Sequence, residues 1–324
     1  MRRNDARLCY DVSIYNQIFP FLMRRRSDSL VFHTMTLDVT ECAKYIRAYN
    51  ATKPELRLKF FYVFCAAVMR IFVLRPELNR FIAQNRYWQR NELSMSFVVK
   101  ENFTDDSPET SNPLRFKPEM TLFEYAKIID DYINGARRVS QDSNFTDDTI
   151  DLFLHFPTWL VSLAIRFLGF LDRHGRCPQF VRDADGLHTS VFIANLGSIG
   201  IEGGSPHHHL YEWGTTSMFI TLGRMERTRE FDDNGKVVST RETLQIGFTV
   251  DERVTSGFYF IKSMAMLQDF MDDPSLLEKV PEIPRDTMTK AEFKAFKKEQ
   301  KKQKKLKIKA EKEAKKEASK ESHS

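Results

Sequence analysis

The chain has 324 residues, of which 42% are hydrophobic and 12% aromatic, so it is long and apolar enough to bury a large core. This composition excludes fibrous and wholly disordered proteins. The formal net charge is +5, but residues 290–324 contain 14 Lys and 6 Glu and carry +8, which leaves about −3 for the rest. We therefore expect a folded domain over residues 1–285, a Lys-rich disordered or helical tail over 286–324, and no specific nucleic-acid binding.

The cysteine pattern predicts reduced thiols in a cytoplasmic protein. Four cysteines lie far apart in the chain and form no Cys-x-x-Cys pair. The first five residues lack the apolar run of a secretory signal. Residues 152–171 approach the length of a membrane span, but His155, Pro157 and Arg166 interrupt them, so we expect a buried helix there and no membrane span.

The first half of the chain alternates between strand and helix patterns. Residues 28–40 are apolar on both faces, which predicts a strand covered on each side, and Thr40 is expected to cap a short helix. Residues 58–74 form a nearly unbroken apolar run, which predicts a core helix. A hairpin is expected within 81–100, followed by a proline-rich loop and by a helix that begins with a capping box at Thr121 and Glu124.

The second half is mostly β-like in pattern. Three segments rich in β-branched and aromatic residues predict strands: 188–195, 217–223 and 244–250. A turn over Asp232–Gly235 predicts a hairpin between 226–231 and 236–244. A last helix from Gly257 places four apolar residues on one face: Phe260, Met264, Leu267 and Met271. Helices and strands in this order predict a mixed-sheet α/β sandwich.

The tail from Thr289 onward is composed of Lys, Glu, Ala and Gln with few large apolar residues. The spacing of Glu and Lys favours a solvated helix. Two interpretations remain open, a basic arm for an acidic partner and a solubilising appendage.

The common nucleotide-binding, zinc-protease and serine-hydrolase motifs are absent from the sequence. His207, His208 and His209 are consecutive, so they cannot all turn toward one ion from an extended segment, and we expect no metal site. One of them is a candidate general base, and the alternative is a polar loop at a subunit contact. Three other histidines lie singly in apolar patterns and are interpreted as hydrogen-bonded core residues: His33, His155 and His188.

Two segments carry a family resemblance. Residues 192–200 read Phe-Ile-Ala-Asn-Leu-Gly-Ser-Ile-Gly, and residues 248–257 read Phe-Thr-Val-Asp-Glu-Arg-Val-Thr-Ser-Gly. Together with Arg-Pro-Glu-Leu-Asn at 75–79 and the segment 213–224, they resemble the chloramphenicol acetyltransferase-like superfamily. The resemblance is greatest to the catalytic domain of the 2-oxoacid dehydrogenase dihydrolipoamide acyltransferases, and it covers roughly residues 10 to 280 in the right order.

The resemblance implies a two-layer mixed-sheet α/β fold and acyl transfer from acyl-CoA or acyl-lipoamide at the interface of a homotrimer. In the family a His in the pattern His-x-x-x-Asp-Gly removes a proton from the acceptor, and a hydroxyl binds the oxyanion of the intermediate. Coenzyme A or acyl-CoA is therefore the ligand we expect. The chain shows no lipoyl attachment segment, so we expect no lipoyl group on it.

The reactive positions of the family pattern are replaced. Glu252 stands in place of the His, Ser256 in place of the Asp, and Ala194 in place of the hydroxyl residue. Three residues of the pattern are retained and are interpreted as structural, through strand pairing, an ion pair and close packing: Asp251, Arg253 and Gly257. The pattern thus predicts a catalytically degenerate acyltransferase, a pseudoenzyme.

Two alternatives remain open. One is an active acyltransferase with a rearranged site, in which Glu252 or a histidine of 207–209, such as His208, is the base. The other is a non-enzymatic scaffold or ligand-sensing module that uses the Lys-rich tail to bind an acidic partner.

Overall fold

The computed structural model describes residues 3–100, 109–139, 155–201 and 206–321. Its centre is a six-stranded sheet of the order β2-β11-β10-β9-β5-β8. The strands are β2 (Leu30–Asp38), β11 (Val237–Asp251), β10 (Met218–Phe231), β9 (Val191–Asn195), β5 (Leu93–Phe97) and β8 (Leu114–Phe116). Strand β9 is parallel to both of its neighbours and the other pairs are antiparallel, so the sheet is mixed, as the sequence predicts.

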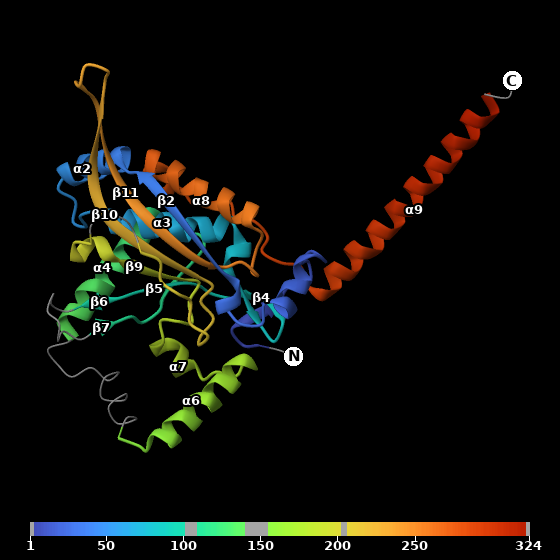
Figure 1. The fold of residues 1–324 in the computed structure, drawn as a ribbon, viewed down its shortest axis with the longest axis horizontal. Helices are drawn as coiled ribbons and strands as arrows, with labels where there is room; N and C mark the ends of the chain where they lie inside the picture. The colour runs from blue at the N-terminus through green and yellow to red at the C-terminus, as the bar shows by residue number, and fades with distance from the viewer. Residues whose placement is uncertain (1–2, 101–108, 140–154, 202–205, 322–324) are drawn as a thin grey trace.

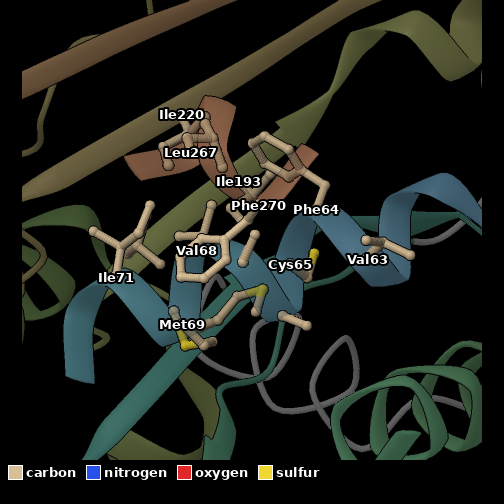
Figure 2. Packing of buried hydrophobic residues seen from close by; sticks show 14 of the residues in the cluster. Val63, Phe64, Cys65, Val68, Met69, Ile71, Ile193, Ile220, Leu267 and Phe270 are labelled. Atoms are coloured by element: carbon tan, nitrogen blue, oxygen red, sulfur yellow. The ribbon is translucent and has the colours of Figure 1, made fainter. Parts of the chain in front are cut away.

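A layer of helices covers one face of this sheet (Figure 1). It contains α2 (Thr40–Ala51), α3 (Phe60–Leu74), α4 (Leu122–Val139) and α8 (Gly257–Asp272). In the core between the layers, Phe64 of α3 and Phe270 of α8 lie near Ile193 of β9 and Ile220 of β10 (Figure 2). The predicted two-layer α/β sandwich is confirmed.

The central helix α3 is buried along almost its whole length, from Tyr62 through Val73. Because every turn of it meets apolar neighbours, an amphipathic pattern is absent and the sequence reads as one apolar run. The one charged residue in that run, Arg70, is hydrogen-bonded to carbonyl groups: Nη2 donates to Met120 at 3.1 Å and to Leu277 at 3.2 Å. The predicted core helix is thus confirmed.

The remaining elements are short. A second, antiparallel sheet of order β1-β4-β3 is formed by β1 (Ala6–Leu8), β4 (Arg86–Arg90) and β3 (Arg80–Ala83), and β6 (Val99–Lys100) pairs with β7 (Glu109–Thr110). The further α-helices are α1 (Phe19–Leu22), α6 (Thr158–Arg173), α7 (Gln179–Ala184) and α9 (Lys290–Glu321). Five 3₁₀ turns complete the description: η1 (Asn16–Ile18), η2 (Ser27–Ser29), η3 (Pro76–Asn79), η4 (Leu196–Ile199) and η5 (Pro274–Leu277).

Strands β10 and β11 form one long hairpin whose tip projects beyond the helical layer (Figure 1). At the tip the Asp232 N–H donates to the Lys236 carbonyl at 2.9 Å, and Gly235 has a φ of 78° that favours glycine. The predicted hairpin is confirmed. The segments 236–244 and 244–250, which the sequence suggests as separate strands, are one continuous strand.

Two local expectations are wrong. Thr40 does not cap α2: the Asp38 carboxylate accepts from the Thr40 N–H at 2.9 Å, and the Thr40 hydroxyl accepts from the Glu242 N–H at 2.9 Å. Nor is β2 covered on each side. Leu37 is buried under the helices, whereas Phe32, on the outer face, is 55% exposed. Apolar residues on both faces of β2 therefore do not mean burial on both faces in a single chain.

Helix α6 was expected to be buried and is instead largely exposed. Trp159 is 68% exposed and Phe167 58%, and α6 lies at the periphery, away from the helical layer (Figure 1). Only its C-terminal end, at Asp172, is buried. The expectation failed because an apolar helix signals burial only when the same chain supplies a covering surface. No described helix is long and apolar enough to cross a membrane.

The tail forms α9, which projects away from the rest of the molecule (Figure 1). The hydroxyl and the N–H of Thr289 both donate to the Glu292 carboxylate, at 2.6 and 2.8 Å, which fixes the first turn. Just before it, the Thr287 hydroxyl donates to Asp11 at 2.7 Å, and the ring of Phe293 in the first turn contacts that of Tyr10, so the helix leaves the body after these contacts.

Candidate functional site

The turn between β11 and α8 is held by a buried ion pair. Asp251 is 1% exposed and accepts from Arg253 Nε at 2.8 Å, from Arg253 Nη2 at 2.7 Å and from the Ser29 hydroxyl at 2.9 Å. Arg253 Nη1 also donates to the Met23 carbonyl at 2.8 Å. These bonds satisfy both charges and join the turn to the segment before β2. Asp251 and Arg253 therefore have the structural role that the sequence predicts.

Glu252 lies between these two residues and faces solvent. Its N–H donates to the Ser29 carbonyl at 2.9 Å, which fixes the backbone, and no other described residue makes a hydrogen bond or ion pair with its carboxylate. The turn thus presents a solvent-exposed carboxylate at the position that the resemblance leads us to expect for the imidazole of the family pattern. A carboxylate is a weaker base than an imidazole toward a thiol or hydroxyl.

Ser256 is the N-cap of α8, and its hydroxyl accepts from the Tyr259 N–H at 3.3 Å. This bond satisfies one of the free amides of the first helical turn, so capping accounts for the residue without chemistry. The next residue, Gly257, has no heavy atom within 4 Å of the position that a Cβ would occupy. The expected close packing at Gly257 is therefore wrong.

Ala194 lies on β9 and lines an apolar cavity of about 330 Å³ at the end of that strand. The other apolar lining residues include Phe61, Phe97, Val99, Ile133, Leu196 and Ile199. Ser198 also lines the cavity, but its hydroxyl donates to the Asn195 carbonyl at 2.7 Å. The cavity is thus mostly apolar, next to the position at which the resemblance leads us to expect the family's oxyanion-binding hydroxyl.

Within one chain the sheet separates Ala194 from Glu252. Ala194 is in register with Thr221 of β10, and Thr221 is in register with Gly247 of β11. Glu252 follows Gly247 by five residues, so it lies about 17 Å farther along the sheet at the usual rise per residue, in the turn after β11. A single chain does not bring these two positions together.

The histidine loop lies against the outer face of the sheet. The His208 ring stacks on Phe219 with 4.1 Å between centroids and 10° between planes, and its Nδ1 donates to the His209 carbonyl at 2.8 Å. His207 Nε2 donates to the His33 carbonyl at 3.1 Å. Ala194 packs against the same cluster that contains Phe219, so His208 and Ala194 share the outer face.

A cleft of about 780 Å³ adjoins the turn that carries Glu252, and arginines dominate its charge. Arg253 lines it from the turn, while the buried Arg26 guanidinium donates to the Gly214 carbonyl at 3.0 Å. Three further arginines are exposed, and no described acidic residue pairs with their side chains: Arg24, Arg25 and Arg173. Free guanidinium groups around a cleft are typical of sites for phosphate or carboxylate ligands.

Sequence reasoning missed this cleft, although the run Arg24-Arg25-Arg26 was visible as a signal. Charge alone does not mark this run as part of a site, because the tail of the chain is a longer and more basic segment. What defines the cleft is its other wall, formed by the segment from His209 to Thr215 and by Arg173 at the end of α6.

Neither the comparison with protein-family models nor that with curated protein sequences finds a match. Solved structures do match. The cubic core of the pyruvate dehydrogenase multienzyme complex is similar with a TM-score of 0.52 and 16% identity, over 81% of this chain and 89% of that one. The truncated catalytic core of the 2-oxoacid dehydrogenase multienzyme complex from Thermoplasma acidophilum is similar with a TM-score of 0.50 and 14% identity, over 83% of this chain and 99% of that one.

A third similar structure is dihydrolipoamide acetyltransferase from Azotobacter vinelandii, with a TM-score of 0.51 and 16% identity over 81% of this chain and 88% of that one. That structure was determined to investigate the role of a serine, a histidine and an asparagine in the catalytic mechanism of that enzyme. At such identities the likeness concerns the fold. The chain therefore has the fold of the acyltransferase catalytic cores of 2-oxoacid dehydrogenase complexes.

Proposed function

We propose that the chain is a catalytically degenerate acyltransferase that binds coenzyme A or acyl-CoA between copies of itself. One observation carries the proposal. The Asp251–Arg253 pair keeps the β11–α8 turn in place, whereas the side chains at the three reactive positions are an exposed carboxylate, a helix cap and a methyl group. The framework of the site is retained and its acid–base and oxyanion groups are replaced.

The two hollows of the molecule support a ligand of this chemical class. Coenzyme A joins a phosphorylated nucleotide to an uncharged thiol arm, and an acyl group extends that arm. The arginine-lined cleft suits the phosphates, and the apolar cavity at Ala194 suits an acyl group and its arm. The cavity and the cleft are each lined by residues of this chain.

The separation of the two hollows supports assembly from several copies. Because Ala194 and Glu252 lie at different ends of the sheet in one chain, a second copy that brings its turn to the first copy's cavity would place both positions beside the reacting end of one ligand. The exposed apolar residues of β2 and α6, among them Phe32 and Trp159, supply surface for such contact. A homotrimer is the arrangement that the family resemblance implies. The four free, buried cysteines support a cytoplasmic location as part of the same proposal.

Thermal unfolding with coenzyme A tests the binding. Saturating ligand raises the melting temperature, because at one hundred times Kd it stabilises the folded state by about 2.7 kcal/mol. The double variant Arg24→Ala/Arg25→Ala lowers the shift, and Arg229→Ala on the exposed part of β10 is the matched control. An unchanged melting temperature with coenzyme A and with acetyl-CoA would contradict the proposal.

A thiol-release assay with acetyl-CoA and small alcohol, amine or dithiol acceptors tests the degeneracy. We expect no turnover above the uncatalysed rate. Turnover that disappears in Glu252→Gln would show that the carboxylate is a working base and would overturn this part of the proposal while leaving coenzyme A binding intact.

The shared face of His208 and Ala194 favours a second candidate, an active acyltransferase that uses His208 as base. Stacking on Phe219 holds the ring, and Nε2 is the nitrogen left for substrate, because Nδ1 donates to the His209 carbonyl. This candidate predicts turnover that is lost in His208→Ala and kept in His155→Ala, which changes an exposed histidine elsewhere. Absence of turnover in the wild-type chain excludes it.

A further inference from the structure

Three side chains with metal-binding atoms meet under the C-terminal end of α6. They are Asp172, Cys177 and His188, and their carboxylate oxygen, Sγ and imidazole nitrogen all lie within 4.8 Å of one another. All three residues are buried. The cluster lies apart from Glu252 and Ala194. Asp172 also lines the arginine-rich cleft, whereas Cys177 and His188 do not, and the function proposed above assigns the cluster no role.

The turn after α6 explains how the first two residues come together. The Gly175 N–H donates to the Asp172 carbonyl and the Arg176 N–H to the Leu171 carbonyl, both at 2.8 Å, which is the hydrogen-bond pattern of a Schellman C-cap. Gly175 has a φ of 67°, and a Cβ there would lie 2.8 Å from the Arg3 Cα, so glycine is required. Because the chain reverses its direction at this turn, Cys177 lies beside Asp172.

His188 belongs to the segment before β9, and one of its two ring nitrogens is hydrogen-bonded outside the cluster. Its Nδ1 donates to Asp185 Oδ2 at 2.7 Å, and the Trp213 indole N–H donates to the same oxygen. The other nitrogen, Nε2, has no hydrogen bond of good geometry, although the side chain is 1% exposed. A buried polar atom without a hydrogen bond is uncommon and calls for a partner.

The nearest oxygen to Nε2 is Asp172 Oδ1, at 3.3 Å. Two ligands of a tetrahedral zinc ion with bonds of about 2.0 Å lie about 3.3 Å apart, so this separation matches two coordination positions. A carboxylate on the other ring nitrogen, such as Asp185 here, is the usual outer partner of a zinc-bound histidine. Thiolate, imidazole and carboxylate together are ligands that Zn²⁺ accepts.

From this geometry we infer that Asp172, Cys177 and His188 bind one Zn²⁺ ion through Oδ1, Sγ and Nε2, with a water molecule in the fourth position. The ion joins the end of α6 and the turn after it to the segment that leads into β9. Three protein ligands and one water are more typical of catalytic than of structural zinc. The role that we assign to this ion is nevertheless structural, because its ligands are buried and it lies where an otherwise exposed helix is attached.

Two cationic side chains, Arg3 and His188, lie near the Asp172 carboxylate and define the alternative to a metal ion. Arg3 Nη2 lies 3.4 Å from Asp172 Oδ1, but the Arg3 charge is already paired with Asp5 through two bonds of 2.8 Å. Without a metal, His188 itself is the second cation. Burial lowers the pKa of His188, but the neighbouring carboxylates of Asp172 and Asp185 outweigh this and raise it to about 11. The alternative is thus an imidazolium between two carboxylates, with no ion.

Metal analysis of the purified chain, produced without an affinity tag, distinguishes a bound zinc ion from an imidazolium without an ion. We expect about one zinc ion per chain after dialysis, and well below that in Cys177→Ser and in His188→Gln, because each variant removes a ligand. Cys9→Ser, which changes a buried cysteine elsewhere, keeps the zinc. The triple variant His207→Ala/His208→Ala/His209→Ala also keeps it, which excludes binding by the histidine loop. Asp185→Asn removes only the outer partner and weakens zinc binding about 10- to 100-fold.

Cobalt binding to the wild-type chain provides a readout that does not depend on whether the variants fold. Replacement of zinc by Co²⁺ is expected to give the intense visible bands of a tetrahedral ion and a thiolate-to-cobalt band in the near ultraviolet. A wild-type chain that holds no zinc and gives no such spectrum with Co²⁺ overturns the inference, as does a zinc content that Cys177→Ser leaves unchanged.

Discussion

The Arg253 guanidinium binds both oxygens of the Asp251 carboxylate, Nε to Oδ1 at 2.8 Å and Nη2 to Oδ2 at 2.7 Å, two residues apart at the end of β11. Both side chains are nearly inaccessible to solvent. We expect Arg253→Ala to lower the free energy of unfolding by about 3–5 kcal/mol, because it leaves a buried carboxylate without its cation. Urea denaturation measures this loss.

Arg241→Ala is the matched control for that prediction. Arg241 pairs with Glu230 at 3.1 Å on the exposed part of the β10–β11 hairpin, where such a pair contributes at most about 1 kcal/mol. Equal losses in the two variants would show that the Asp251–Arg253 pair does not hold the turn.

The retained residues of this turn show how far sequence alone could reach. The identities of Asp251 and Arg253 predict a local ion pair, and the structure confirms it. The third member of the network, Ser29, lies 222 residues away in sequence and becomes visible only because β2 pairs with β11. Local patterns predict local contacts, whereas contacts between distant segments require the sheet order.

The same reason explains the site residues that the sequence missed. The apolar runs of α3 and α8 predict their own helices and burial, and the predicted face of α8 with Phe260 and Leu267 is buried. The arginine cleft and the zinc ligands instead depend on where α6 and its following turn are placed. The apolar pattern of α6 correctly predicts a helix, but it wrongly predicts that this helix is buried.

Leu267 lies fully buried between α8 and the sheet, near Ile193 and Ile220 (Figure 2). Leu267→Ala is expected to lower the free energy of unfolding by about 2–5 kcal/mol, because the side chain is removed from a packed core that relaxes only in part. Leu276→Ala, at a position that is 39% exposed, is expected to cost less than half as much. Urea denaturation of both variants checks the prediction, and a smaller loss for Leu267 would contradict the described core.

Asp5 makes stability depend on acid pH. Burial raises the pKa of the Asp5 carboxyl, but hydrogen bonds and the charge of Arg3 outweigh it, so the folded-state pKa lies below its ordinary value of 3.8. The carboxylate therefore stabilises the fold above the unfolded-state pKa, and this contribution disappears as pH falls through the lower folded-state pKa.

The variant Asp5→Asn tests this dependence. Its deficit in unfolding free energy relative to the wild-type chain is expected to be largest near neutral pH and to shrink as the pH falls below about 4. Urea denaturation at pH 3 to 7 measures the difference. A deficit that is constant over this range would mean that the Asp5 charge does not contribute.

Helix α9 is expected to be dispensable for folding and required for binding to acidic partners. The helix projects away from the body (Figure 1), and the ring contact of Phe293 with Tyr10, at 6.4 Å, lies in its first turn. Removal of residues 296–324 is therefore expected to leave the melting temperature nearly unchanged. These residues carry a net positive charge, so the full chain binds polyglutamate with an affinity that falls as salt rises, because the salt screens the charges. Fluorescence anisotropy with labelled polyglutamate at two salt concentrations measures this, and equal binding by the full and the shortened chain would assign the tail no role in recognising an acidic partner.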